Sequence, residues 1–185
     1  MSLLDKMIAA VTPSESEESR ADARRQARAA AGNGDWLSMI LDQHDQVERA
    51  FAAVKAAPDR ARRVLAHKWL ATILIGHANA EETAIYPALT AISERSHATV
   101  GYSEQATVKV QLGLLETLDP MSRAYLDKLE HLEGVVQHHV YAEESNWLLD
   151  LKRKVPASQE SRLTRRYKEE LERYLGDERP PRASS

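Results

Sequence analysis

The sequence predicts an all-α protein, an antiparallel up-down four-helix bundle with an extra helix at each end. Apolar residues recur every three or four positions along four long segments, which is the period of amphipathic helices. Alanine, leucine, glutamate and arginine dominate the composition, and the scarce glycines and prolines stand between the periodic segments. No alternating run of β-branched and aromatic residues is long enough to predict a sheet.

The first two bundle helices are predicted in the first half of the chain. The first begins at Asp35, a suitable N-cap, and runs to about Ala57. The second follows Asp59 and reaches Pro87, which is expected to kink or end it. Their apolar stripes are Trp36, Ile40, Val47, Phe51 and Val54 in the first helix and Val64, Leu70 and Ile73 in the second.

The second pair of helices is predicted after a loop around Ser93 to Gly101. The stripe of the third helix consists of Gln105, Val108, Leu112 and Leu115. Asp119 and Pro120 are predicted to begin the fourth helix as its N-cap and first-turn proline. We therefore divide the chain into a helical arm at 1–34, the bundle at 35–155, a C-terminal helix at 156–176 and a disordered tail at 177–185.

The composition of the chain excludes several classes of partner and of metal ligand. The formal net charge is −3, so no nucleic acid and no anionic membrane is expected as a partner. There is no cysteine, so any transition metal must be held by nitrogen and oxygen ligands. The N-terminal segment lacks the features of a signal peptide and no stretch is long enough to span a membrane, so a cytoplasmic location is expected.

The chain contains an internal repeat. Residues 77–89 read HANAEETAIYPAL and residues 139–151 read HVYAEESNWLLDL, so both follow His-x-x-Ala-Glu-Glu-[Thr/Ser]. A sequence shift nearly equal to the one between these two segments aligns the first helix with the third. The chain is therefore predicted to consist of two related helical hairpins around an approximate twofold axis. The repeat breaks at one place, where His44 falls on Gln105.

The repeated motif predicts a metal site. Residues four apart share a helix face, so His77 with Glu81, and His139 with Glu143, form two pairs that continue the apolar stripes. A buried carboxylate requires a partner, a proton or a metal. Together with His44, these pairs would converge in the bundle core, where facing helices build metal sites, and either carboxylate could bridge two ions.

Neighbouring polar residues are interpreted as structural. Glu82 and Glu144 are expected at the helix boundary or in solvent, as outer partners of the ligands. Tyr86 and Tyr141 lie beside the motifs and could donate a hydrogen bond or a proton, but the favoured interpretation is that they pack with their hydroxyls near the surface. The other residues interpreted in this way are His67, His131 and His138, at ordinary polar positions, and Arg20, Arg24, Arg25 and Arg28, on a solvated helix face.

These motifs resemble the hemerythrin-like proteins that carry the HHE cation-binding domain. That family has a histidine on helix one, His-x-x-x-Glu on helix two, a histidine on helix three and His-x-x-x-Glu on helix four. LDQHDQVERAF resembles the first motif, HANAEETAIYPAL the second with its Tyr-Pro, and HHVYAEES the fourth. The resemblance covers roughly residues 35 to 152 and implies a hemerythrin-like bundle.

The resemblance implies a ligand set and a chemistry. Carried over residue by residue, it makes His44, His77, Glu81, His139 and Glu143 the ligands of a non-haem diiron centre. The family implies binding of dioxygen, or related chemistry with peroxide or nitric oxide. A site of nitrogen and oxygen atoms also accepts zinc or manganese, and iron is preferred because of the resemblance.

The sequence departs from the family on the third helix, where Gln105 holds the histidine position. Three hypotheses follow. The diiron centre persists with water or Gln105 at that position, Glu104 or His97 takes the place of the histidine, or only one metal binds tightly. His97 precedes Gln105 by eight residues, about 12 Å along a continuous helix, so its use needs a bend or a loop.

Three functions are compatible with these residues, and the sequence leaves open whether the protein is an enzyme. The leading hypothesis is a non-haem iron protein that binds or reduces a small diatomic or peroxide ligand. The alternative is a metal- or oxygen-responsive sensor or interaction module without turnover, whose terminal helices dock a protein partner or a second copy. The third is a structural bundle with a degenerate site, which the two retained carboxylate pairs disfavour.

Overall fold

The computed structural model describes residues 15–176. This range contains helices and no strand, which confirms the predicted all-α class. None of its helices combines the length and apolar character needed to cross a bilayer. The tail predicted to be disordered, 177–185, and the first fourteen residues of the predicted arm lie outside the described residues.

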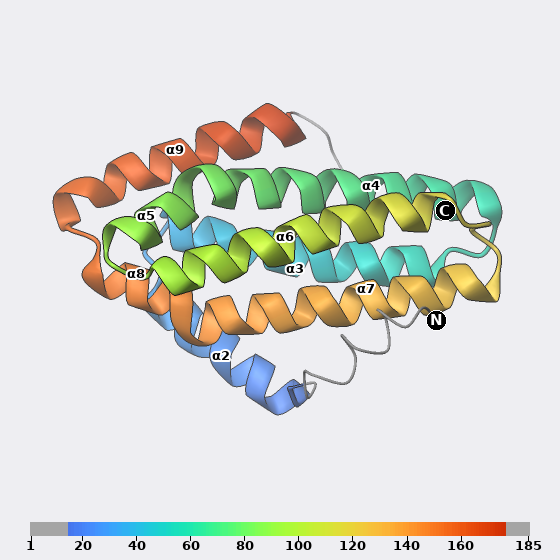
Figure 1. Cartoon of the computed structure of the whole chain (residues 1–185), viewed down its shortest axis with the longest axis horizontal. Helices are drawn as coiled ribbons and strands as arrows, with labels where there is room; N and C mark the ends of the chain where they lie inside the picture. The colour runs from blue at the N-terminus through green and yellow to red at the C-terminus, as the bar shows by residue number, and fades with distance from the viewer. Residues whose placement is uncertain (1–14, 177–185) are drawn as a thin grey trace.

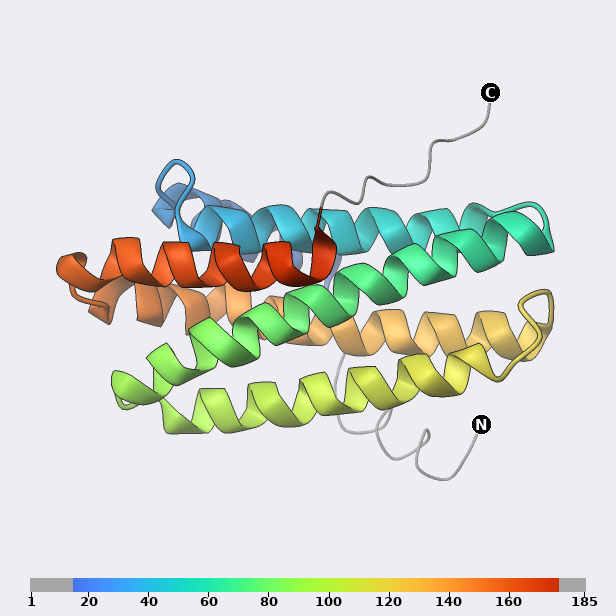
Figure 2. The same ribbon diagram turned by 90° about the horizontal axis from the view of Figure 1, so that it is seen from above.

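Four long helices form the body of the molecule. They are α3 (Trp36–Ala56), α4 (Arg60–Ala80), α6 (Arg95–Glu116) and α7 (Arg123–Ala142). They lie lengthwise beside one another, and short turns join α3 to α4 and α6 to α7 at the same end (Figures 1 and 2). Helix α3 contacts α4 and α7, and α6 contacts the same two helices, so the four enclose a common interior.

The terminal helices pack on one half of this body. Helix α2 (Glu17–Ala30) buries Ala23 and Ala27 against α3, α7 and the segment that follows α7. Helix α9 (Ala157–Leu175) buries Leu163 and Tyr167 against α4 and α3 (Figure 1). Docking of a partner through these helices stays a prediction. Such a partner would bind the faces of α2 and α9 that point away from the bundle.

Helix starts follow the capping rules. Asp35 accepts a hydrogen bond from the Ser38 amide at 2.7 Å, as the sequence predicts, and Asp59 caps α4 in the same way. The fourth helix begins later than predicted, because Ser122 is its N-cap and accepts from the Tyr125 amide at 3.1 Å. Asp119 instead accepts from the Met121 amide within the preceding turn.

The loop between the second and third helices is shorter than predicted. Only residues 92–94 separate the helices, and α6 already begins at Arg95, so most of the segment from Ser93 to Gly101 is helical. Ser93 adopts a positive φ of 72°, which reverses the chain within these three residues. Ser93 therefore supplies the left-handed conformation that the turn needs, whereas Gly101 is part of the helix.

Both repeated motifs contain a π-helical turn. The segments are η1 (Glu81–Ile85), followed by α5 (Tyr86–Ala91), and η2 (Glu143–Trp147), followed by α8 (Leu148–Lys154). The Tyr86 amide donates to the Glu81 carbonyl, and the Leu148 amide donates to the Glu143 carbonyl. Each turn thus begins at a glutamate of the repeat, and such bulges are frequent at functional sites.

The second helix does not end at Pro87, so of the two predicted outcomes, an end or a kink, the end is wrong. The helix reaches Ala91 through η1 and α5. Proline lacks an amide hydrogen and disrupts the regular i→i−4 pattern, and the π turn directly before it absorbs this change of register.

The apolar core is divided into two clusters. One surrounds Trp36 and Leu148 at the end covered by α2 and α9, and the other surrounds Phe51 and Leu129 along the remaining length. On α3, Leu41 belongs to the first cluster and Val47 to the second, with buried His44 between them. The polar motif therefore lies where the two clusters meet.

A pair of glycines on α6 tests the packing around Tyr86. A Cβ at Gly101 would lie 2.7 Å from Cζ of Tyr86, whereas nothing lies within 4 Å of one at Gly113. We expect Gly113→Ala to raise the free energy of unfolding by up to about 1 kcal/mol through helix propensity. Gly101→Ala should lower it by about 1–3 kcal/mol because the tyrosine ring must move. Urea denaturation measures both, and equal effects would contradict the packing.

Candidate metal centre

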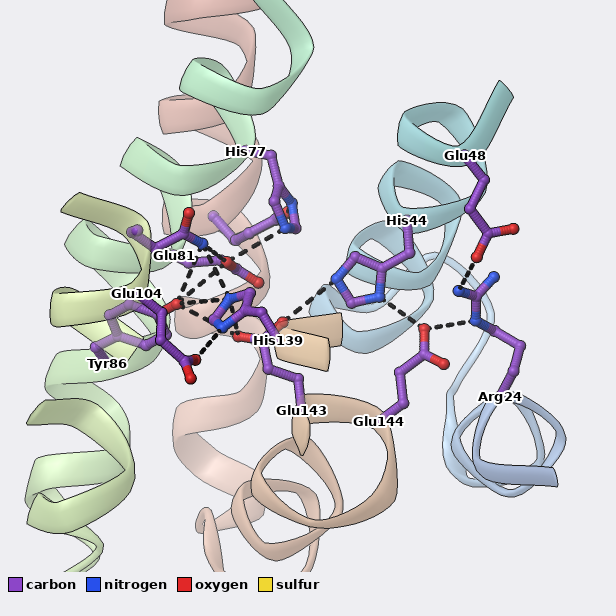
Figure 3. A network of polar contacts seen from close by, with 12 residues as sticks. Arg24, His44, Glu48, His77, Glu81, Tyr86, Glu104, His139, Glu143 and Glu144 are labelled. Atoms are coloured by element: carbon purple, nitrogen blue, oxygen red, sulfur yellow. Dashed lines mark hydrogen bonds and ion pairs between the residues drawn. The ribbon is translucent and has the colours of Figure 1, made fainter. Parts of the chain in front are cut away.

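Side chains from three helices and both π turns converge at the junction of the two core clusters. His44 on α3, His77 on α4, Glu81 in η1 and Glu143 in η2 are all buried, and their ligand atoms lie within 4.8 Å of one another. His139 on α7 is also buried beside them (Figure 3). The structure thus brings together the five residues that the sequence singled out.

The histidine Nε2 atoms face the carboxylates. His77 Nε2 lies 3.3 Å from Oε2 of Glu81, four residues along the same continuous helix. His139 Nε2 lies 3.4 Å from Oε1 of Glu143, and His44 Nε2 lies 3.3 Å from Oε2 of the same glutamate. Because Glu143 contacts histidines from two helices, it stands at the centre of the group.

The Nδ1 atoms of the three histidines are engaged from outside the cluster. His44 Nδ1 contacts Oε1 of Glu144 at 2.7 Å, and His139 Nδ1 contacts Oε2 of Glu104 at 2.7 Å. His77 Nδ1 lies 3.4 Å from the Tyr167 hydroxyl. A histidine that donates Nδ1–H to an outer acceptor presents the Nε2 lone pair inward, which is the arrangement found at metal sites.

Three atoms directed into the cluster have no hydrogen-bond partner among the described residues. They are Nε2 of His44, Oε1 of Glu81 and Oε2 of Glu143, all buried. Nε2 of His44 and Oε2 of Glu143 face each other at 3.3 Å as an ion pair but do not have hydrogen-bond geometry. Buried polar atoms are nearly always hydrogen-bonded, so these two atoms and Oε1 of Glu81 require an explanation. A cation would take these atoms as ligands and would neutralise the carboxylates, so the residues present fit a metal ion.

The electrostatics of the cluster favour a positive charge at its centre. Burial and the neighbouring charge of Glu143 raise the pKa of Glu81 well above its ordinary range. Burial also opposes ionisation of Glu143, but His139 and His44 lower the pKa of this carboxyl to about 2. Burial would lower the pKa of His44, yet Glu143 and Glu144 raise it to about 9. Protons therefore supply the charge that a metal would supply, and metal binding would displace them.

His77 has the opposite titration behaviour. Burial and the positive charges of His44 and His139 lower the pKa of His77 to about 3. Its imidazole is therefore neutral at physiological pH, which is the form that binds metals.

Gln105 and Tyr86 occupy the position where the resemblance expects a third-helix histidine. Gln105 Nε2 donates to Oε2 of Glu81 at 2.9 Å and lies 3.1 Å from Nε2 of His139. The Tyr86 hydroxyl lies 3.3 Å from the same histidine nitrogen and 3.4 Å from Oε1 of Glu143. Burial and the charges of both carboxylates raise the pKa of Tyr86 well above its ordinary range, so the hydroxyl remains a donor.

The prediction that the Tyr86 hydroxyl lies near the surface is wrong. The side chain is fully buried and directed into the cluster. The π turn that ends one residue earlier changes the helical register, so a face judged from 3.6-residue periodicity is displaced at this position.

The two candidate substitutes for a third-helix histidine lie elsewhere. Glu104 is bound to Nδ1 of His139, on the outer side of that ring. His97 stacks on Trp147, with ring centroids 5.5 Å apart, and its Nδ1 lies 3.6 Å from Glu94. Helix α6 is continuous from Arg95 and contains no bend that would carry His97 to the cluster.

Arg24 and Glu144 correct two further predictions. The predicted role of Glu144 as an outer partner of a ligand is confirmed, since it contacts Nδ1 of His44 at 2.7 Å and also accepts from Arg24. Its predicted place at the helix boundary or in solvent is wrong, because it is only 2% exposed. Arg24 also pairs with Glu48 (Figure 3). It pairs with Asp45 as well, so it is not part of a solvated face. Periodicity could not reveal this because the partners of α2 are distant in sequence.

Other residues occupy the positions expected of structural groups. Glu82, the repeat counterpart of Glu144, pairs with Lys109 at the partly exposed edge of the bundle. His67 is buried but bonds to the Tyr125 hydroxyl at 2.8 Å, away from the cluster. Sequence reasoning had no basis for selecting Tyr167, because it lies on a polar helix 16 residues beyond the end of the second repeat at Leu151.

Comparison with known proteins identifies the domain. The sequence model of the hemerythrin HHE cation binding domain matches residues 36–151, which is more than half of the chain. No curated protein and no solved structure compared with the chain matches it.

Neighbouring arginines on α2 test the outer hydrogen bonds. Arg24→Met removes the guanidinium partner of buried Glu144 and leaves it with His44 alone, and we expect it to lower the free energy of unfolding by about 1–3 kcal/mol. Arg25→Met removes only an exposed pair with Asp22, so its effect should remain within about 0.5 kcal/mol. Thermal denaturation of the two variants makes the comparison, and similar losses would argue against a structural link from α2 to the cluster.

Proposed function

The chain belongs to the hemerythrin family with the HHE cation-binding domain, and on this premise we propose that its buried cluster holds non-haem iron, as a diiron centre. The centre would bind or reduce a small ligand such as dioxygen, peroxide or nitric oxide. The proposal includes the antiparallel up-down order of α3, α4, α6 and α7 that the sequence predicts.

One observation carries the proposal. Three buried histidines are fixed at Nδ1 by outer partners and direct Nε2 toward two buried carboxylates. The donor atoms are nitrogen and oxygen, which suit iron, zinc and manganese, and family membership favours iron among them.

The proposed ligands are His44, His77, Glu81, His139 and Glu143. Bound iron would supply a redox-active Lewis acid with an open position for a small ligand. Glu81 and Glu143 each offer two carboxylate oxygens, so either can bridge two ions. Glu104 and Glu144 hold two of the imidazoles in orientation.

The remaining groups at the cluster act on a bound ligand rather than on the metal. The protonated Tyr86 hydroxyl and the Gln105 amide both donate toward the space between His139 and Glu81. They can therefore hydrogen-bond a polar oxygen or nitrogen atom there. The apolar side chains of both core clusters surround the site and limit access by bulk water.

A sensor without turnover is the second candidate. Arg24 and Glu144 connect the arm helix α2 directly to His44, so a change at the metal would alter a contact that anchors this helix. A change in oligomeric state on metal binding, with no consumption of peroxide, would favour the sensor. Peroxide turnover would favour the leading proposal.

Two histidines on α4 test the site. We expect protein from iron-supplemented cells to contain up to about two iron ions per chain and an iron charge-transfer band. His77→Ala removes an inward Nε2 and should lower iron affinity by more than the roughly 10–100-fold typical of losing an outer partner. His67→Ala removes a buried histidine outside the cluster and should leave iron content unchanged. Elemental analysis with absorption spectra measures this. Equal iron in all three proteins would refute the site.

Gln105 tests the limit on stoichiometry. Replacement by histidine restores a nitrogen ligand where the family has one, so Gln105→His should raise the iron content per chain. Gln111→His, at a buried glutamine two turns along the same helix, provides the control and should not change it. An unchanged iron content in Gln105→His would show that this position does not limit the site.

A further inference from the structure

A small cavity lies inside the bundle against the proposed metal ligands. Its volume is about 10 Å³, close to the space that one water molecule occupies. The side chains that line it are His44, His77, Gln105 and His139 on the polar side and Val47, Leu74, Val108, Val136 and Val140 on the apolar side.

A much larger pocket opens beneath the arm helix. Its volume is about 380 Å³, and it lies between α2, α3 and α7. Arg24 of α2 borders the pocket and forms ion pairs with Glu144, Asp45 and Glu48. These ion pairs hold the arm helix in place over the pocket. The pocket at the far end of the bundle, around His67, shares no lining residue with the inner cavity.

The two spaces share a wall. His44, Val47, Val136 and Val140 line both the inner cavity and the pocket beneath α2. The same side chains therefore face both the outer pocket and the metal cluster. The three valine side chains carry no polar atoms, so they bind no water that an entering molecule would have to displace. We propose that this pocket is the entrance by which a small uncharged molecule reaches the centre, across the wall formed by Val47, Val136 and Val140.

The side chains that line the entrance favour one class of ligand, small neutral molecules. This inference rests on the proposed function, since it assumes that the ligand travels to a metal centre. An apolar wall admits a neutral diatomic molecule with little loss of hydration, whereas an ion would lose its water shell there. The charged groups that line the pocket are four carboxylates (Glu17, Glu48, Glu133 and Glu144) and two guanidinium groups (Arg20 and Arg24). This excess of negative charge further disfavours small anions.

The first test uses the metal-free full-length protein. Dissolved dioxygen is paramagnetic and speeds the nuclear relaxation of methyl groups that it visits. We expect strong enhancement at Val47, Val136 and Val140, and at Val108 across the inner cavity, but not at Val54, a buried valine that lines neither space. Val136→Phe should reduce the enhancement at Val108, and Val136→Ala should increase it.

The second test uses the iron-loaded protein and nitric oxide as the probe. Val136→Phe should slow association of nitric oxide about tenfold, and Val136→Ala should accelerate it, at unchanged iron content. Val108→Ala is the matched control, since it enlarges the inner cavity from α6 without thinning the wall, and should leave the rate unchanged.

The outcomes separate the entrance from the proposed function. Relaxation at Val108 that is insensitive to both Val136 variants would overturn the entrance, because dioxygen would then arrive by another route. If the phenylalanine variant fails to fold, the alanine variant alone decides, since it must open the wall. A protein that takes up no iron when iron is supplied, but whose metal-free form shows the relaxation pattern, would refute the iron proposal and keep the entrance.

Discussion

The structure depends on two carboxylates placed where the bundle would otherwise be apolar. Glu81 and Glu143 are fully buried, and the free-energy cost of burying them is offset by a proton on Glu81, by the hydrogen bonds that Gln105 and Tyr86 donate, and by convergent histidines or a cation. This requirement explains the outer contacts at Nδ1 of all three histidines, because each imidazole must be oriented before its inner nitrogen can help. It also explains why the arm helix and the C-terminal helix pack at this end of the bundle, since each carries a side chain that touches this arrangement.

The fold was largely predictable because helical periodicity is a local property. The cap at Asp35 and the extent of the first bundle helix follow directly from it. Errors occurred where one local signal outweighed another, as at Ser122, which caps in place of Asp119. The continuation through Pro87 could not be foreseen, because a π turn leaves no mark in a pattern of period 3.6.

The inner part of the site was predictable, whereas in the outer part only the role of Glu144 as a partner of a ligand was. His77 with Glu81, and His139 with Glu143, are spaced by helix geometry, so the sequence places each pair on one face. The partners of Nδ1 come from other helices, and nothing in the order of residues connects Arg24 to Glu144, or Tyr167 to His77. Long-range packing decides these contacts, and a single sequence does not encode them in a readable way.

The contact between Tyr167 and His77 bears on what counts as the working unit of this protein. The region that defines the family ends at residue 151, yet one imidazole is oriented by a hydroxyl sixteen residues beyond it, and another through an arginine twelve residues before its start at 36. A fragment trimmed to the family limits would retain every inner donor and lose part of the scaffold that aims them. In this chain the flanking helices α2 and α9 therefore belong to the proposed metal site, and the family domain alone lacks part of that site.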